Sequence, residues 1–144
     1  MKDVYANVYN KKTLMIVTET EMKKALDMLI DKIKLDYSMW SKKGGSDYDT
    51  VRNNMIKEFN DGITMKESKY YYKIYSGNSI WGFIVKEDKT IRGKDWKKGD
   101  ILKAASYLTP ALNKPRGNIF GNYIVKWTGP VYLNDPAYYR MIGQ

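Results

Sequence analysis

Aromatic and basic side chains alternate along residues 69–126 of the chain. Alternate side chains of a strand share one face, so Tyr71, Lys73 and Tyr75 are expected to lie together. Tyrosine rings can stack on unpaired bases, each worth roughly 1–3 kcal/mol, while ammonium groups contact phosphates. Because lysine acts as a point charge, such a surface would contact the backbone of single-stranded DNA or RNA rather than read its sequence. The alternative is that these tyrosines simply pack in a sheet.

A second basic stretch, residues 86–103, surrounds Trp96 with seven basic and four acidic side chains. These charges should stay in solvent and form one side of an electropositive surface, because burying unpaired ammonium groups is prohibitive. Trp96 is expected either to anchor this stretch to the sheet or to act as a stacking platform. Arg116 lies in a loop that its prolines make rigid, and it could make a bidentate contact with a phosphate or a base. The predicted nucleic-acid-binding residues are Tyr71, Lys73, Tyr75, Lys86, Lys89, Arg92, Lys94, Trp96, Lys97, Lys98, Lys103 and Arg116.

The chain contains no histidine and no cysteine. Their absence removes the usual general base, the thiol nucleophile and the commonest metal ligands. One nuclease-like arrangement remains, in which Asp61 and Glu87 would hold a divalent metal while Lys89 steadies the attacking water. Asp61 is explained equally well by a turn, and an E-x-K motif arises easily in a lysine-rich chain. We therefore expect no enzymatic activity, no cofactor and no metal site.

The 144 residues carry a net charge of +9, and nearly all of the excess lies in one segment. Residues 69–126 hold 12 basic and 4 acidic side chains, whereas residues 1–68 hold 12 and 11. This asymmetry points to a partner rich in phosphate or carboxylate groups, although lysine is also the usual solubilising residue. No apolar run resembles a signal peptide or a membrane helix, and the lack of cysteine suits a reducing cytosol. The expected location is the cytoplasm, without membrane attachment.

The first half of the chain predicts two helices. Thr18 and Glu21 form a capping box ahead of an amphipathic stripe with spacings of three and four residues. The glycines of "KKGG" would end this helix, and Ser46 would cap the next one. The predicted helices span 19–41 and 47–60, after a predicted hairpin of strands at 4–9 and 13–18.

From residue 68 onward the pattern becomes that of strands. The runs "KYYYKIY" and "IWGFIVK" flank "SGNS" and give the strongest hairpin signal in the chain. The glycine of "KKGD" predicts a tight turn with positive φ, and two prolines keep "TPALNKPRG" out of regular structure. Further strands are predicted at 100–105, 117–120 and 123–128.

These elements predict one α+β domain over 1–144, with a mainly helical region over 1–67 and a basic, aromatic-rich β region over 68–144. The two helices should pack beside an antiparallel sheet or a small barrel. The predicted core comprises Leu26, Leu29, Ile33, Val51, Met55, Phe59, Trp81, Phe83, Ile101 and Val125.

Residues 80–133 resemble a block found in small bacteriophage-encoded proteins of unassigned function. The resemblance depends on the motifs "KGDILKAA", "RGNI" and "WTGP", and it implies a phage origin without identifying active-site residues. Most small phage proteins outside the virion either handle nucleic acid or bind and disable a host protein. The resemblance therefore leaves two alternatives: a nucleic-acid-binding protein, or an inhibitor whose basic–aromatic face docks on an acidic host protein. For the inhibitor, Trp96, Trp127 and the aromatic tail 131–144 are candidates for an exposed apolar patch.

Overall fold

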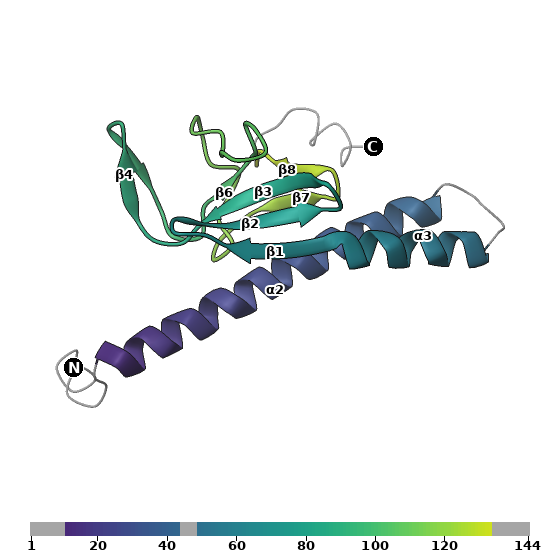
Figure 1. Cartoon of the computed structure of the whole chain (residues 1–144), viewed down its shortest axis with the longest axis horizontal. Helices are drawn as coiled ribbons and strands as arrows, with labels where there is room; N and C mark the ends of the chain where they lie inside the picture. Colours follow the sequence, from purple (N-terminus) through teal and green to yellow (C-terminus); the bar gives the residue numbers. More distant parts are fainter. Residues whose placement is uncertain (1–10, 44–48, 134–144) are drawn as a thin grey trace.

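The computed structural model describes residues 11–43 and 49–133 and has the expected α+β class. Within these residues, both helices precede all of the strands. Figure 1 shows the long helix α2 running beneath the sheet, with α3 beside it. The elements are α2 (Lys11–Lys43), α3 (Asp49–Gly62), β1 (Ile63–Glu67), β2 (Tyr71–Ser76), β3 (Ser79–Val85), β4 (Lys89–Ile91), β5 (Lys94–Trp96), β6 (Ile101–Leu102), β7 (Ile124–Lys126) and β8 (Gly129–Val131).

A four-stranded antiparallel sheet, ordered β1-β2-β3-β6, forms the centre of the protein. This sheet stays open, so the small barrel considered as an alternative is wrong. The β2–β3 hairpin is confirmed, and Gly77 takes a φ of 60° at the first central position of its turn. Strand β1 is absent from the predicted elements; it follows α3 directly and pairs with the free edge of β2.

The start of α2 differs from the prediction. Residues 13–18, expected to form a strand, are helical, and the helix begins at Lys11. Thr18 therefore lies inside the helix and does not cap it. Extending an existing helix adds one hydrogen bond per residue, which outweighs the modest strand preference of Val, Ile and Thr. The partner strand at 4–9, the "KKGG" terminus and the Ser46 cap lie outside the described residues.

One face of the sheet packs against α2. Leu26, Leu29 and Ile33 are buried and join one apolar cluster with Ile74 and Ile84 of the sheet. We call this cluster the helix-facing core. It confirms the helical stripe, because residues spaced by three and four positions turn to the same side of the helix. The other predicted core residues that are buried are Trp81, Phe83 and Ile101, while Phe59 and Val125 are partly buried against the helix-facing core.

Two residues predicted for the core lie on the surface. Val51 and Met55 of α3 are 56% and 44% exposed. The side of α3 that packs inward carries Phe59, whose ring stacks on Tyr37 of α2 at 4.0 Å between centroids. Periodicity shows that α3 has an apolar side, but it does not show how much of that side a neighbour covers.

A β-bulge in β3 places Trp81 in the helix-facing core. Ile74 pairs with Gly82 and Tyr75 pairs with Ile80, so Trp81 has no partner in the β2–β3 register. The extra residue turns the Trp81 ring towards α2, where the side chain is 2% exposed and its Nε1–H donates to the carbonyl oxygen of Lys126 at 2.9 Å.

The hairpin β4–β5 closes a portion of the opposite face. It occupies residues 89–96, within the basic stretch 86–103, and projects from one end of the sheet (Figure 1). Trp96 is 2% exposed and forms a second buried cluster, the outer core, with Phe83, Val85 and Leu102. Trp96 is therefore an anchor, and the alternative role as a stacking platform is wrong.

The "KKGD" turn after the hairpin is held by hydrogen bonds. Gly99 has the expected positive φ, of 89°, and a Cβ there would lie 2.6 Å from the Phe120 ring. Asp100 is buried and accepts from the Lys97 amide at 2.8 Å and from Asn118 Nδ2 at 3.0 Å. These bonds let a strongly charged stretch fold back against an apolar sheet.

The last predicted strands are shorter than expected. Residues 117–120 form only isolated bridges, because the Asn118 side chain and the Ile119 amide bond the "KKGD" turn instead of a neighbouring strand. The strand predicted at 123–128 is reduced to β7, which pairs with β8. Among the described residues, no helix is both long and apolar enough to cross a bilayer.

The anchoring role of Trp96 predicts a large loss of stability in Trp96→Ala. Truncating this buried ring should lower the free energy of unfolding by about 3–5 kcal/mol, as large-to-small substitutions of buried aromatics do. Denaturant unfolding followed by circular dichroism measures it. Lys97→Ala, at the exposed next position, is the control and should stay within about 0.5 kcal/mol of wild type. Equal midpoints for Trp96→Ala and wild type would contradict the anchor.

Candidate nucleic-acid interface

Tyrosine and lysine side chains gather on the side of β2 that faces away from α2. Tyr71, Lys73 and Tyr75 of β2 lie there as the alternation predicted, since Tyr71 and Lys73 both contact Phe83 of the outer core. Tyr70, which directly precedes β2, and residues from three other segments join them. We call this surface the tyrosine–lysine face, and it comprises Lys66, Tyr70, Tyr71, Lys73, Tyr75, Lys89 and Tyr107.

Lys73 lies at the centre of one group of rings. Its Nζ is 4.2 Å from the centroid of Tyr107, 5.2 Å from Tyr75 and 5.7 Å from Phe83. The rings of Tyr75 and Tyr107 meet edge to face with centroids 6.1 Å apart. An ammonium group within about 6 Å of a ring centroid is attracted by the ring quadrupole. Lys73 is therefore held among aromatic rings while Tyr107 remains 55% exposed.

Lys89 forms a second group with the tyrosines at the start of β2. Its Nζ lies 3.8 Å from the Tyr71 ring centroid and 4.7 Å from that of Tyr70. Burial lowers the pKa of the Lys89 ammonium below its usual 10.5 and raises the pKa of the Tyr71 phenol above 10.0. Both shifts arise because the outer core removes water from one side of these groups.

The tyrosine–lysine face has little negative charge to balance it. Lys73 and Lys89 form no ion pair with any carboxylate of the described residues. Three of the four carboxylates in residues 69–126 accept hydrogen bonds in the hairpin and the turn that follows it, and the fourth, Glu87, lines a groove beside α2. The three pairs are Asp88 with the Lys98 amide, Asp95 with Thr90 Oγ1 and Asp100 with the Lys97 amide, at 2.7, 2.6 and 2.8 Å.

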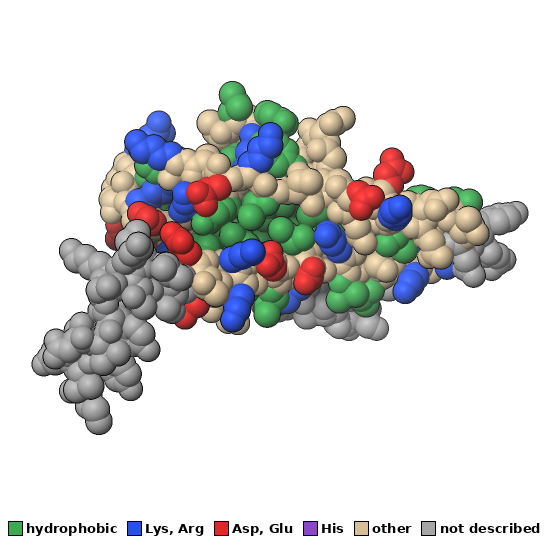
Figure 2. All heavy atoms as spheres, turned by 60° about the horizontal axis from the view of Figure 1, so that its bottom comes forward, with side chains coloured by type: hydrophobic (Ala, Val, Ile, Leu, Met, Phe, Trp, Pro, Cys, Tyr) green, Lys and Arg blue, Asp and Glu red, His purple; other side chains and the backbone are tan. Residues whose placement is uncertain are grey.

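Two of the predicted basic residues lie elsewhere. Lys86 and Lys98 line a groove of about 570 Å³ between α2 and the sheet, whose lining includes Met22 and Tyr72. Lys86 also pairs with Glu67 at 3.2 Å. The side of the molecule that carries α2 faces forward in Figure 2, where hydrophobic side chains gather in the middle and charged side chains of both signs surround them. The expectation of one continuous basic surface is therefore wrong, because β2 and β3 separate these lysines from Lys73 and Lys89.

Three further predicted residues lie on or beside the β4–β5 hairpin. Arg92 and Gly93 form its turn with φ values of 52° and 77°, which exposes the Arg92 side chain at the tip. Lys94 donates to the carbonyl oxygen of Asn113, so its ammonium ties the hairpin to the proline-rich loop. Lys97 is exposed beside the buried Trp96. Of this basic stretch, only Lys89 belongs to the tyrosine–lysine face.

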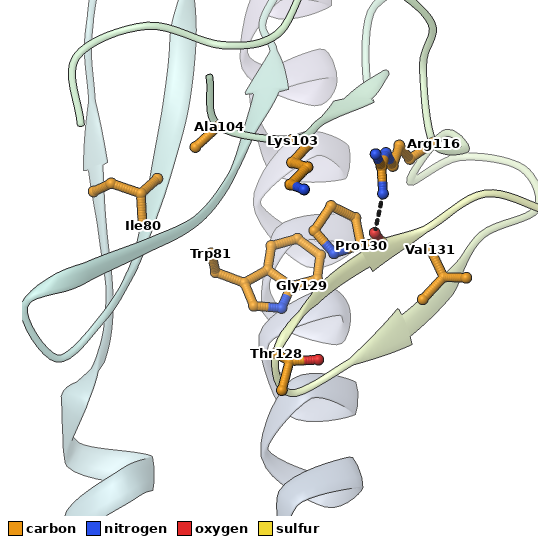
Figure 3. Close-up of a pocket in the computed structure, with 9 residues that line it drawn as sticks. All are labelled: Ile80, Trp81, Lys103, Ala104, Arg116, Thr128, Gly129, Pro130 and Val131. Carbon is orange, nitrogen blue, oxygen red and sulfur yellow. Dashed lines mark hydrogen bonds between the residues drawn. The ribbon is translucent and has the colours of Figure 1, made fainter. Parts of the chain in front are cut away.

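Lys103 and Arg116 line a separate pocket of about 260 Å³ beside β8 (Figure 3). The guanidinium of Arg116 stacks on Tyr132, with its Cζ 3.9 Å from the ring centroid, and Nη1 donates to the Pro130 carbonyl at 3.0 Å. Arg116 is thus fixed in place, as the prolines of its loop suggested. No carboxylate of the described residues lines this pocket.

Sequence reasoning missed three members of the tyrosine–lysine face. Lys66 belongs to the unpredicted strand β1 and lies opposite Lys73 in register. Tyr70 precedes β2, where strand alternation no longer determines its direction. Tyr107 lies in an irregular loop that bears no periodic signal, and only the folded chain brings its ring over Lys73.

The nuclease-like arrangement is not assembled. Gly62 accepts a hydrogen bond from the Gly77 amide, which places Asp61 at the β2–β3 turn. Glu87 follows the other end of β3, a strand of seven residues that spans roughly 20 Å. Two carboxylates so far apart cannot share one metal ion. Within the described residues no cluster of three or more potential metal ligands is present.

A further surface is aromatic rather than basic. Tyr37 and Trp40 of α2, Phe59 of α3 and Trp127 pack ring against ring, with centroids 4.0–5.9 Å apart. They line a pocket of about 420 Å³, which we call the aromatic pocket. Trp40 is 52% exposed, so this cluster reaches solvent. Tyr37 is buried, whereas Trp40, three residues further along the same helix, lies at the surface.

No protein-family model, curated protein or solved structure matches the chain. The geometry of its own surfaces is therefore the basis for assigning a function.

The position of Lys89 predicts a measurable dependence of stability on pH. Between its lowered pKa and 10.5, the unfolded chain binds more protons than the folded chain, so the free energy of unfolding should rise with pH in that window. Lys89→Met removes the titrating group and should reduce this rise. Urea unfolding at several pH values measures it, with Lys57→Met on exposed α3 as the control. The same slope in Lys89→Met and wild type would show that Lys89 is not desolvated.

Proposed function

We propose that the protein binds single-stranded DNA or RNA, largely through the phosphate backbone, on its tyrosine–lysine face. The observation that carries this proposal is the placement of Lys73 and Lys89 beside tyrosine rings, without a carboxylate partner in the described residues. Of these rings, those of Tyr70 and Tyr107 are exposed. Flat rings offer stacking surfaces to unpaired bases, and the neighbouring ammonium groups can neutralise phosphates. A duplex hides its base faces, so the rings would gain nothing from it.

We propose that this binding is not accompanied by catalysis. The chain lacks histidine and cysteine, and the one arrangement of carboxylates that resembled a nuclease is spread over both ends of β3. The lack of cysteine fits a reducing cytoplasm, where we propose that the protein acts. If the resemblance to phage proteins holds, this is the cytoplasm of the host cell.

Single-strand binding should weaken when Lys73 becomes glutamate or Tyr107 becomes alanine. Reversing one phosphate-contacting charge should reduce affinity roughly tenfold and lower the slope of log affinity against log salt by about 0.7. Removing one stacking ring should cost roughly 1–3 kcal/mol of binding free energy. Fluorescence anisotropy of a labelled single strand, titrated from about 50 mM salt beside a duplex of equal length, measures both effects.

Lys57→Glu is the matched control, because it makes the same charge change on the exposed side of α3. It should reduce affinity far less than Lys73→Glu. No binding at about 50 mM salt, or equal losses in the two variants, would rule out the tyrosine–lysine face.

A second candidate function is suggested by the aromatic pocket. Exposed tryptophan and methionine side chains are enriched at the centres of protein–protein interfaces, and Trp40 and Met55 line this pocket with 52% and 44% of their surface exposed. We propose as the alternative that an acidic host protein docks here by inserting an aromatic or aliphatic side chain. The net charge of +9 would favour its approach.

The docking alternative predicts a partner that depends on Trp40. After nuclease treatment of a host lysate, a protein retained by the wild type and by Tyr107→Ala should be lost from Trp40→Ala. A central tryptophan typically contributes about 2 kcal/mol or more to binding, which is enough to abolish retention. Circular dichroism checks that Trp40→Ala remains folded. Equal retention by all three proteins, or by none, would contradict this alternative.

A further inference from the structure

The pocket between Lys103 and Arg116 has the chemistry of an oxyanion site. Two basic side chains from different segments line it, and no carboxylate of the described residues does. Figure 3 shows the Arg116 guanidinium and the Lys103 ammonium directed towards the same space beside Pro130. A guanidinium presents donors in a planar fork that matches phosphate oxygens, and a lysine adds a mobile charge opposite it.

Arg116 is held ready for such a ligand before the ligand arrives. The Tyr132 ring and the Pro130 carbonyl fix the guanidinium, while its Nε is buried without a hydrogen-bond partner among the described residues. A buried charged donor with no acceptor is costly, and an oxyanion near the guanidinium would offset its charge. Ordering Arg116 in the free protein also reduces the entropy that binding must overcome.

The size and location of the pocket restrict the ligand. Its volume of about 260 Å³ suits one small group such as a phosphate, because drug-sized molecules occupy roughly 300–1,000 Å³. Ile80 lines the pocket and pairs across the hairpin with Tyr75 of the tyrosine–lysine face. A strand bound on that face could therefore place its end in the pocket.

We propose that this pocket binds the terminal phosphate monoester of a nucleic-acid strand. A terminal phosphate carries about −1.5 to −2 charges at neutral pH, more than an internal phosphodiester, so two converging cations favour it. A concave pocket also suits a chain end, whereas internal phosphates follow an open surface. The identification of the ligand as a nucleic-acid strand rests on the proposed function, whereas the affinity of the pocket for a phosphate group is independent of it.

The test compares single strands that end in a 5′-phosphate, a 3′-phosphate or only hydroxyl groups, using fluorescence anisotropy. One of the phosphorylated strands should bind about tenfold more tightly than the hydroxyl strand, the gain from one charge-assisted contact. Lys103→Gln and Arg116→Gln should remove this difference, so that each variant binds the phosphorylated strand and the hydroxyl strand with equal affinity. Because Lys103 is exposed, Lys103→Gln keeps the test valid even if Arg116→Gln unfolds.

Lys114→Gln is the matched control. Lys114 is exposed and also lies over Tyr132, at 5.5 Å, but it does not line the pocket, so its loss should preserve the preference for the phosphorylated end. Equal affinity of the wild type for all three strands would overturn the proposal, and so would a preference that survives Lys103→Gln.

Binding of inorganic phosphate tests the pocket independently of single-strand binding. Phosphate should shift the amide resonances of Thr128 and Gly129 in the wild type and in Lys114→Gln, but not in Lys103→Gln. If no strand binds and these shifts appear, single-strand binding fails while the pocket stands as a phosphate site. Identical responses of Lys103→Gln and Lys114→Gln would overturn the pocket.

Discussion

The rest of the fold depends on the burial of β3 on both of its faces. From Trp81 to Val85 every residue of this strand is buried, so the sheet needs an apolar cover on each side. The helix α2 supplies one cover and the outer core around Trp96 supplies the other. An antiparallel sheet more commonly leaves one face to solvent. Here the second cover is small, and it leaves the neighbouring strand β2 only partly shielded on that side.

The partial cover explains the character of the tyrosine–lysine face. Tyr71 and Lys73 stand at the margin of the outer core, where their stems pack on Phe83 while their polar ends reach water. In the free protein the lysines lie over the tyrosine rings, a contact worth about 0.5–1 kcal/mol at an exposed site. A stacked base is worth roughly 1–3 kcal/mol, so a bound strand could displace these ammonium groups onto its phosphates at modest cost.

The local structure of the β4–β5 hairpin keeps its carboxylates away from the lysines of the tyrosine–lysine face. Three of the four carboxylates that accompany the basic residues in sequence accept backbone or hydroxyl hydrogen bonds in β4–β5 and in the "KKGD" turn. These carboxylates stabilise the hairpin and the turn that follows it, and they do not pair with the lysines of β2 and β4. The aromatic pocket lies in another region of the molecule, at the junction of α2 and α3, so the two surfaces can be altered independently.

Local patterns in the sequence determined the α+β class, the stripe of α2, the β2–β3 hairpin and the side of β2 that carries Tyr71 and Lys73. Each depends on neighbours within a few residues, where periodicity and turn chemistry act. Tertiary structure alone decided that Trp96 is buried, that Trp40 and Met55 are exposed, and that Lys86 and Lys98 lie apart from Lys89. Burial of a side chain depends on which distant segment covers it. Where the chain reverses direction between strands, lysines that are close in sequence can lie on opposite faces of the sheet. Local sequence patterns do not show on which face each of them lies.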